Sequence, residues 1–376
     1  MYNRIIKPQI LDKLFCGKAI IIVGSRQVGK TTLSNILIKE SRLEEEKVMR
    51  FNCDNPTDRE ALNNRDFEFL KQLIGSRKII FIDEAQKVDT IGQTIKLLVD
   101  GFKEEKQIIA TGSSSLNLLD KTSEPLTGRK IVYRLHSLSL EEIYPDKNIL
   151  KISKELEMLL IYGNYPAIIN AQSTQEKSDA LRELSGSYLY KDILEFQAVR
   201  NPSVLTALLK ALALQVGAEV SYNELSNIVG IDKKTVERYI DLLEKNFIIF
   251  RLPPFFKNQR RAISKLRKIY FYDLGIRNAI INNFNFLENR GDVGAIWENF
   301  CITERMKYQE YNRLYKNNYF LRTYDGAEID FIEEAGGNVS GYEFKWGKRR
   351  TDDGIKHLAD IDYTVITPEN ISGFII

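Results

Sequence analysis

The sequence predicts a multidomain α/β protein with a parallel-sheet domain first and a second α/β unit last. Three observations predict this organisation. A glycine-rich loop near the start lies between an apolar strand and a helix with an apolar stripe. A run of helix, helix, turn, helix and strand begins near residue 200, and short strands recur towards the C-terminus. The length of 376 residues is too great for one compact core and is typical of two to four domains.

Composition limits the classes of protein to which the chain can belong. Hydrophobic residues make up 43% and charged residues 28%, as in an ordinary globular protein. The net charge of +3 does not by itself indicate a nucleic-acid binder. The three cysteines are far apart, which argues against a disulfide framework and a structural zinc site. No run reaches the roughly 20 apolar residues of a membrane span, so we expect a soluble, cytoplasmic protein without a signal peptide.

The stretch "KAIIIVGSRQVGKTTLSNILIKE" predicts a strand, a glycine loop and a helix. The apolar run Ala19–Val23 is typical of a strand, and Leu33, Ile36 and Leu37 form a helical stripe. Between them, Gly24–Thr31 matches the pattern G-x-x-x-x-G-K-[ST]. In such a loop, backbone N–H groups and the helix N-terminus bind phosphate oxygens. We therefore expect ATP to contact Gly24, Ser25, Arg26, Gln27, Val28, Gly29, Lys30, Thr31 and Thr32.

An acidic pair after the next apolar strand supports this interpretation. Lys30 would reach the β- and γ-phosphates, and the Thr31 hydroxyl would bind Mg²⁺. In "KIIFIDEAQ", the strand Ile79–Ile82 ends in Asp83 and Glu84, at the strand end where open α/β sheets bind ligands. Asp83 would hold Mg²⁺ through water, and Glu84 would activate the attacking water molecule.

Two further segments offer candidate residues for the same chemistry. In "QIIATGSSS", the strand Gln107–Ala110 leads to Ser113 and Ser114, either of which would sense the γ-phosphate unless they form an ordinary loop. In "LTGRKIVYRL", Arg129 precedes a strand. It is either a surface arginine or a finger that reaches the nucleotide of a neighbouring subunit, and a finger implies a homo-oligomer.

These segments resemble a prokaryotic family of AAA-type P-loop ATPases that are fused to a C-terminal domain of unknown function (AAA_14/DUF4143-like). The segments that carry the resemblance are GSRQVGKTTL, FIDEAQ, TGSSS, LTGR, YGNYPAII and YLYKDI, which span nearly the whole chain. The resemblance implies nucleotide-binding residues at Gly29, Lys30, Thr31, Asp83 and Glu84. Gln86 is also typical of the family, but neither the resemblance nor the pattern assigns it a chemical role.

The middle of the chain predicts a winged helix-turn-helix. A helix covers about residues 201–216, Ser221 caps a second helix, and Asp232 caps a third over Lys233–Asn246. The strand Phe247–Leu252 follows. The first half of the third helix, where a recognition helix presents base-reading residues, carries Lys233, Lys234, Thr235, Glu237 and Arg238. This unit would either contact DNA or serve as a structural bridge between domains.

A basic run follows the winged helix. "FFKNQRRAISKLRKIYFYD" contains Lys257, Arg260, Arg261, Lys265, Arg267 and Lys268 without an intervening acid. The run is either a solvated loop or a patch that follows nucleic-acid phosphates, whose binding would depend steeply on salt concentration.

The C-terminal segment predicts a second α/β unit that begins with the strand Ile269–Tyr272. "GAIWENFCITERMKYQEY" predicts a long amphipathic helix, with Ile296, Phe300 and Thr303 on one face. Two strands flank a turn at Asp325-Gly326, and "VSGYEFKWG" and "YTVIT" predict two more.

Charged residues on these strands suggest a nuclease-like metal site. Glu343 and Lys345 share one face of a strand, and Asp330 would join them if the two strands pair. Glu298 would enter from the helix, Asp330 and Glu343 would bind Mg²⁺, and Lys345 would assist the nucleophile. This arrangement resembles that of restriction-endonuclease folds, although Ile329 stands where a proline often precedes the aspartate. The same residues would otherwise be ordinary charges on the solvent face.

The leading hypothesis is an ATPase that engages DNA or RNA and carries a C-terminal Mg²⁺-dependent nuclease-like domain. The alternative is an ATP-controlled interaction or DNA-binding module whose nuclease fold does not cut. A small-molecule kinase is disfavoured because nothing after residue 200 resembles an acceptor site. The expected domains are an ATPase domain at 1–148, a helical connector at 149–200, the winged helix at 201–256 and the nuclease-like domain at 257–376.

Overall fold

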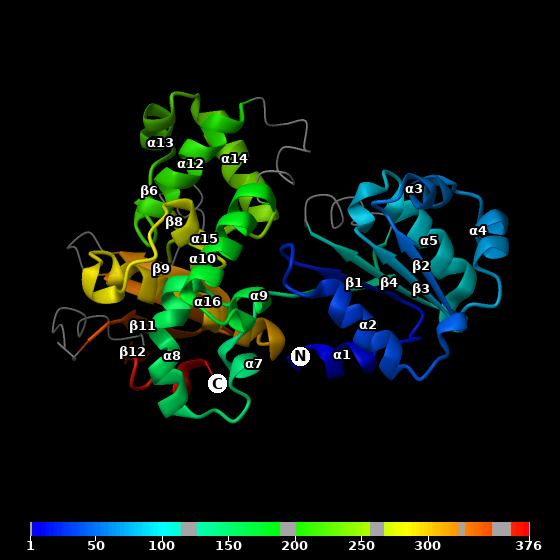
Figure 1. Ribbon diagram of the computed structural model, residues 1–376, viewed down its shortest axis with the longest axis horizontal. Helices are drawn as coiled ribbons and strands as arrows, with labels where there is room; N and C mark the ends of the chain where they lie inside the picture. Colours follow the sequence, from blue (N-terminus) through cyan, green and yellow to red (C-terminus); the bar gives the residue numbers. More distant parts are fainter. Residues whose placement is uncertain are drawn as a thin grey trace. The chain divides into compact units, whose positions relative to one another are not determined.

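The chain divides into two compact units, Met1–His136 with Lys245–Phe247 and Ser137–Glu244 with Ile248–Ile376 (Figure 1). Over the residues that it describes, the computed structural model forms one five-stranded sheet in the first unit and sheets of four and three strands in the second. The residues that the structure describes are 2–113, 126–188, 201–255, 267–322, 328–347 and 362–375.

The sheet of the first unit is wholly parallel, as the sequence predicts. Its strand order is β2 (Val48–Asn52), β3 (Ile79–Asp83), β4 (Gln107–Gly112), β1 (Ala19–Val23) and β5 (Lys130–Arg134). Every residue of β1 and β4 is buried. This burial accounts for the nearly unbroken apolar runs, because a parallel sheet is covered on both faces.

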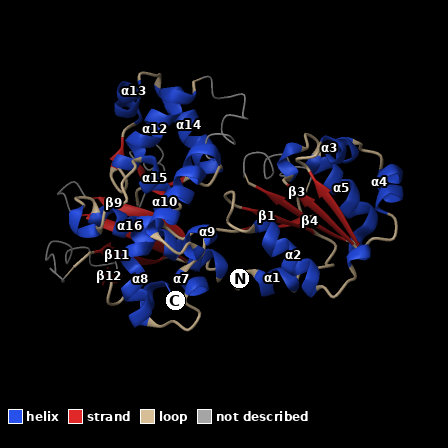
Figure 2. Ribbon diagram, viewed as in Figure 1, coloured by secondary structure: helices blue, strands red, loops and turns tan. Residues whose placement is uncertain are grey.

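Helices cover both faces of this sheet (Figure 2). The crossover from β1 to β2 runs along the sheet in the opposite direction to the crossovers from β2 to β3 and from β3 to β4. Since such connections are right-handed, α2 lies on one face, and α3, α4 and α5 lie on the other. The helices of the first unit are α1 (Lys7–Leu11), α2 (Lys30–Glu40), α3 (Pro56–Asn63), α4 (Phe67–Ile74) and α5 (Ile91–Phe102).

A helical layer opens the second unit. It contains α7 (Leu140–Ile143), α8 (Ile149–Tyr162), α9 (Pro166–Asn170), α10 (Thr174–Glu183) and a π-turn at Leu184–Tyr188. Gly163 ends α8 with a φ of 71°, and a Cβ atom there would lie 2.1 Å from Oδ1 of Asp273. Only glycine permits this close approach of the "YGNYP" segment to Asp273, the residue that caps α15 (Leu274–Ile280).

The predicted three-helix unit forms with the predicted caps. Ser221 accepts the backbone N–H of Glu224 at 3.4 Å, and Asp232 accepts that of Thr235 at 3.0 Å. A three-stranded antiparallel sheet of order β6-β8-β7 accompanies the helices. The elements are α12 (Pro202–Leu214), β6 (Glu219–Val220), α13 (Tyr222–Val229), α14 (Lys233–Lys245), β7 (Ile249–Leu252) and β8 (Arg267–Phe271).

The position of β8 corrects one prediction. The strand expected at Ile269–Tyr272 forms, but it does not open the C-terminal sheet. It pairs with β7 through Ile249↔Phe271 to Leu252↔Lys268. The prediction was wrong because strand pairing is set by contacts across a long connection, which local residue patterns do not reveal.

The C-terminal sheet is mixed, in the order β12-β11-β10-β9. β10 is antiparallel to β9 and β11, whereas β12 is parallel to β11. The predicted turn at Asp325-Gly326 lies outside the described residues. The elements are α15 (Leu274–Ile280), a 3₁₀ turn (Leu287–Asn289), α16 (Val293–Tyr311), β9 (Asn317–Arg322), β10 (Glu328–Ala335), β11 (Asn338–Phe344), β12 (Asp362–Ile366) and α17 (Ser372–Ile375).

α16 is buried on most sides rather than on one face. The prediction of an amphipathic helix was therefore wrong. Trp297, Asn299 and Cys301 are as fully buried as Ile296. The reason is that α16 contacts α8, α15, α17, β8 and β11. Within the described parts of the chain, no helix is both long enough and apolar enough to cross a membrane.

Candidate functional site

The phosphate loop begins with a sharp turn at Gly24, directly after β1. A Cβ atom at Gly24 would lie 2.0 Å from the carbonyl oxygen of Leu135, so a side chain has no room there. Gly29, immediately before α2, has a φ of 98°, which favours glycine. The backbone path therefore requires both glycines of the motif. Of the other loop residues, Ser25 and Arg26 are half-buried, Gln27 is exposed and Val28 is buried.

Lys30 folds its side chain back over this loop. Its Nζ donates to the carbonyl oxygens of Gly24 at 2.9 Å and Ser25 at 2.8 Å. The residue is 5% exposed. The ammonium group is thus held at the centre of the loop by neutral acceptors. Phosphate oxygens carry full negative charge and would form stronger, charge-assisted hydrogen bonds with it.

A hydroxyl group and a carboxylate meet beside the loop. Oγ1 of Thr31 lies 3.2 Å from Oδ1 and 3.0 Å from Oδ2 of Asp83. Thr111, at the end of β4, donates to Oδ1 of Asp83 and accepts the backbone N–H of Glu84 at 3.2 Å. Because these partners are neutral, the negative charge of Asp83 is not compensated by them. A hydroxyl and a charged carboxylate are oxygen ligands of the kind that Mg²⁺ uses beside nucleotide phosphates.

Glu84 is held in an unusual backbone conformation. Its φ of 52° lies in the left-handed region, which costs a non-glycine residue about 1–3 kcal/mol. A 3₁₀ turn, Ala85–Lys87, follows immediately. The turn brings the Gln86 amide to the Glu84 carboxylate, where Nε2 donates to Oε2 and also to Oγ of Ser113 at 3.0 Å. Ser113 therefore lies beside Glu84, as expected for residues near one phosphate; Ser114 lies outside the described residues.

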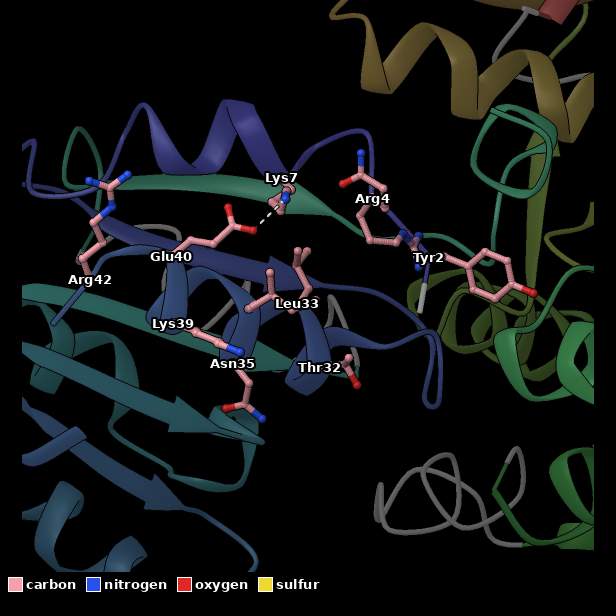
Figure 3. A pocket seen from close by; sticks show the side chains of 11 residues that line it. Tyr2, Arg4, Lys7, Thr32, Leu33, Asn35, Lys39, Glu40 and Arg42 are labelled. Carbon is pink, nitrogen blue, oxygen red and sulfur yellow. Dashed lines mark hydrogen bonds and ion pairs between the residues drawn. The ribbon is translucent and has the colours of Figure 1, made fainter. Parts of the chain in front are cut away.

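A recess of about 920 Å³ runs along α2 from its first turn. Figure 3 shows Thr32 and Leu33 on one side and the N-terminal segment with Arg4 and Lys7 on the other. Four of its lining residues are cationic, Glu40 is acidic, and Lys7 pairs with Glu40 at 2.7 Å. The recess is therefore a positively charged surface that adjoins the phosphate loop.

Arg4 fastens the N-terminal segment to the loop. Its Nη1 donates to the carbonyl oxygen of Val28 at 2.8 Å, and its Nη2 donates to that of His136 at 2.6 Å. The residue is 6% exposed. A sequence pattern gave no signal for this role, because a lone arginine ahead of the first strand has many ordinary explanations.

Arg129 lies at the opposite end of the sheet from the phosphate loop. It immediately precedes β5, which runs parallel to β1, so it is near the N-terminal ends of the strands. Its Nε pairs with Oδ1 of Asp100 at 2.5 Å, and its side chain is 39% exposed. Arg129 thus does not reach the nucleotide site of its own chain, and a role as a finger would require a neighbouring subunit.

The C-terminal candidate residues form a second charged cluster around a lysine. Nζ of Lys268 on β8 lies 2.9 Å from Oε1 of Glu298, 2.7 Å from Oε1 of Glu328 and 3.8 Å from Oδ1 of Asp330. The hydroxyl of Tyr270 donates to Oε1 of Glu298 at 2.5 Å. The expected proximity of Glu298 and Asp330 is therefore present, but a lysine lies among the carboxylates.

Lys268 corrects the interpretation of the basic run. The sequence counted it as a surface cation, whereas the residue is only 3% exposed. Burial opposes its charged form, but Glu298, Asp330 and Glu328 together raise its pKa above the ordinary value. Lys257, Arg260, Arg261 and Lys265 lie outside the described residues.

Burial and mutual repulsion act on the carboxyl groups of this cluster. Burial, followed by the charge of Glu298, raises the pKa of Asp330 well above its usual range, against the lowering effect of Lys268. Burial also raises the pKa of Glu298, again against Lys268. The ammonium of Lys268 is therefore the main positive charge that offsets these buried carboxylates.

Asp330 and Glu343 lie next to one another on paired strands. Phe331 pairs with Tyr342 in an antiparallel register, so Asp330 stands opposite Glu343 one position further along the two strands. The backbone N–H of Phe344 donates to Oδ2 of Asp330 at 2.9 Å. Lys345 pairs with Oε1 of Glu343 at 2.5 Å, while its side chain is 44% exposed. The predicted pairing of the two strands is therefore present.

These residues do not fit a metal ion as they are arranged. Among the described residues, no group of three or more His, Cys, Asp or Glu side chains is positioned to hold a metal. Lys268 contacts three carboxylates, and Lys345 contacts Oε1 of Glu343. Since lysine charges already compensate the carboxylates, the drive to bind a divalent cation is reduced.

The third helix of the middle region exposes a basic end. Its first half has four exposed residues, and Thr235 is half-buried because it bonds to the capping Asp232. The exposed set is Lys233, Lys234, Glu237 and Arg238. The predicted presentation of these side chains is therefore present.

Comparison with protein families divides the chain into three matched segments. A model described as an AAA domain matches residues 17–144. A domain of unknown function (DUF8612) matches residues 153–286, and another (DUF4143) matches residues 293–374. The chain thus combines an AAA-type P-loop ATPase fold with a C-terminal domain of unknown function, as the sequence motifs implied.

Curated relatives are similar over most of the chain. An uncharacterized protein of Mycobacterium tuberculosis is 27% identical over 329 residues, which cover 87% of this chain and 70% of the relative. An uncharacterized protein of Methanocaldococcus jannaschii is 25% identical over 336 residues, which cover 81% and 74%.

Two solved structures match parts of the chain at low similarity. The AMPPCP-bound DnaA of Aquifex aeolicus covers 64% of this chain and 86% of its own, with 18% identity and a TM-score of 0.29. The Pif1 helicase of Candida albicans covers 48% and 47%, with 13% identity and a TM-score of 0.28. Likenesses this low do not bear on the function of this chain.

Proposed function

We propose that this protein binds and hydrolyses MgATP at the loop after β1. The observation that carries the proposal is the convergence of Lys30, Thr31, Asp83 and Glu84 at one edge of a parallel sheet. Ligands of open α/β sheets bind at that edge. The AAA domain match to residues 17–144 supports the same assignment.

Each of these residues has a physical role in the proposed reaction. The loop N–H groups and Lys30 bind the phosphates and stabilise the negative charge that develops on them. Thr31 and Asp83 would hold the Mg²⁺ that accompanies ATP, and this ion neutralises phosphate charge when bound. Glu84 orients water and accepts its proton. The basic recess along α2 is available to the remainder of the nucleotide.

Lys30→Ala tests this proposal. Removing one preorganised donor from such a site lowers kcat by about 100-fold or more. The measurement is release of inorganic phosphate from ATP, with thermal unfolding to establish that the variant folds. The matched control is Lys71→Ala, because Lys71 lies on α4, is 57% exposed and does not line the recess. Normal turnover by a clean Lys30→Ala preparation would contradict the loop assignment.

We further propose that the second unit engages nucleic acid without cutting it, and that it includes a winged helix and a nuclease-like fold. The exposed basic end of α14 supports contact with phosphates, and the β6-β8-β7 sheet beside three helices supports the winged helix. Compensation of Asp330 and Glu298 by Lys268 favours the non-cleaving alternative over a Mg²⁺-dependent nuclease.

A cleavage assay separates these alternatives. Labelled single- and double-stranded DNA and RNA would be incubated with the wild type and Asp330→Ala, with Mg²⁺, Mn²⁺ or chelator, and with or without ATP. Under the non-cleaving proposal, binding is seen without products. Metal-dependent cleavage that disappears in Asp330→Ala would instead support the nuclease.

A mixing experiment tests whether the protein is a homo-oligomer with shared ATP sites. An Arg129→Ala variant that loses ATP turnover but regains it when mixed with Lys30→Ala would support this arrangement.

A further inference from the structure

Gln86 makes contacts that neither the sequence motif nor the proposed roles of its neighbours explain. The residue is 7% exposed, although a glutamine after a strand-end acid is expected to lie in solvent. Its Nε2 donates to Oε2 of Glu84 and to Oγ of Ser113 at 3.0 Å. Both hydrogens of the amide nitrogen are therefore used on two other side chains of the nucleotide site.

The chemistry of the partners fixes which end of the amide faces them. A carboxylate oxygen only accepts hydrogen bonds, so the group beside Oε2 of Glu84 must be the amide nitrogen and not the amide oxygen. Ser113 can then accept from the same nitrogen and donate its own hydrogen to Oε2 of Glu84, 3.3 Å away. The result is a closed triad of Glu84, Gln86 and Ser113.

This triad restrains one oxygen of the expected base. Two of the three hydrogen bonds end on Oε2 of Glu84, the third joins Gln86 to Ser113, and Oε1 of Glu84 takes no part in them. The left-handed backbone at Glu84 and the 3₁₀ turn after it bring Gln86 into reach. A carboxylate held through one oxygen has a defined direction for the other, which is the requirement for a base that must meet a water molecule in one geometry.

Ser113 links the triad to the phosphates. It follows β4, the strand between β1 and β3, so it lies between the loop and Glu84. Its hydroxyl is the group expected to sense the γ-phosphate. A phosphate oxygen that accepted the Ser113 hydrogen would withdraw it from Glu84 and leave the Gln86 amide as the remaining donor to Oε2.

We infer that Gln86 is a positioning residue for ATP hydrolysis, whose amide holds the Glu84 carboxylate in line with the γ-phosphate through Ser113. This inference rests on the proposed ATPase function and adds a residue to it. Gln86 touches neither nucleotide nor water in this role; it acts through Glu84.

The test compares two substitutions that separate donation from space filling. Gln86→Ala removes the amide, and Gln86→Glu keeps its size and shape but replaces the donor by an acceptor. If Gln86 positions Glu84 by donation, kcat falls about 10- to 100-fold in both variants, with Gln86→Glu at least as slow as Gln86→Ala. KM for ATP stays within about twofold, because Gln86 does not touch the nucleotide.

A merely structural role predicts a different order. Filling the buried space would make Gln86→Glu faster than Gln86→Ala, and that order would overturn the inference. Unchanged kcat in both variants would also overturn it. The matched control is Gln93→Ala, an exposed glutamine of the same unit whose amide oxygen accepts from Arg65 at 2.8 Å; its turnover should equal that of the wild type.

Two additional measurements complete the design. A double variant of Gln86→Ala and Ser113→Ala should be less impaired than the product of the two single effects, because the residues act as one unit. Binding of a fluorescent ATP analogue and thermal unfolding establish that the variants fold and bind nucleotide. If the wild type itself hydrolyses no ATP, the proposed function fails. If the wild type hydrolyses ATP and the Gln86 variants do so at the same rate, the inference alone fails.

Discussion

Replacing Lys268 with methionine tests the charge balance of the C-terminal cluster. Methionine keeps an unbranched apolar stem but has no ammonium group. Lys268 contacts Glu298 at 2.9 Å and Glu328 at 2.7 Å, and it lies 3.8 Å from Asp330. The substitution would leave these carboxylates without their shared positive charge.

The cost follows from how deeply each partner is buried. Removing one member of a buried ion pair costs about 3–5 kcal/mol, because the other charge remains uncompensated. The side chains of Glu298 and Asp330 are 14% and 13% exposed, so this range applies to them. Glu328 is 35% exposed, and water screens most of its contribution. We expect Lys268→Met to lose about 3–4 kcal/mol of unfolding free energy, or roughly 10 °C in Tm.

The loss has a defined dependence on pH. The pKa values of Asp330 and Glu298 are raised by burial, and Lys268 lowers both. A carboxyl group with a raised folded-state pKa destabilises the fold above that pKa, and this cost is relieved as pH falls through it. Without Lys268 the folded-state pKa values rise further. The stability deficit of the variant should therefore shrink as pH is lowered from about 8 to about 5.

The assay is urea unfolding of the wild type and Lys268→Met across this pH range. Lys147→Met is a surface control, because Lys147 pairs with Glu141 at 3.4 Å and is 53% exposed. It should change the unfolding free energy by less than about 1 kcal/mol. Equal stability of Lys268→Met and the wild type, or a deficit that grows on acidification, would refute the charge-balance reasoning.

Three other substitutions give separate expectations. Gly24→Ala should abolish binding of a fluorescent ATP analogue, because its Cβ atom would meet a carbonyl oxygen at 2.0 Å; tight binding would contradict the loop geometry. Arg305→Ala should lower the unfolding free energy by about 3 kcal/mol in urea titrations, because it leaves the 1%-exposed Glu333 side chain with one cation fewer; a change below about 1 kcal/mol would refute this. Replacing both Lys233 and Lys234 by alanine should weaken DNA binding and reduce the slope of log affinity against log salt by about two, and an unchanged slope would exclude phosphate contacts there.

The parts of the fold that sequence predicted well are those encoded by neighbouring residues. The apolar strand Ala19–Val23, the loop after it and the caps at Ser221 and Asp232 depend on local backbone geometry, which a short stretch specifies. The pairing of the strands that carry Asp330 and Glu343 was also predictable, because only one short turn separates them.

The parts that sequence missed depend on contacts between distant segments. Lys268 was counted as a surface cation because its neighbours in sequence are basic, whereas its partners come from α16 and β10. Arg4 contacts a backbone carbonyl 132 residues away. The role of Gln86 needed the position of Ser113, which is set by the order of strands in the sheet.

The two acidic sites of the chain differ in the partners of one aspartate each. Asp83 accepts hydrogen bonds from the hydroxyls of Thr31 and Thr111, which orient its oxygens but supply no positive charge. Asp330 accepts a backbone N–H and lies beside the ammonium of Lys268. An oriented carboxylate whose charge is uncompensated attracts a cation, and one whose charge is compensated does not. On this reasoning the proposed role as a Mg²⁺ ligand fits Asp83, whereas Asp330 fits an ionic network with Lys268.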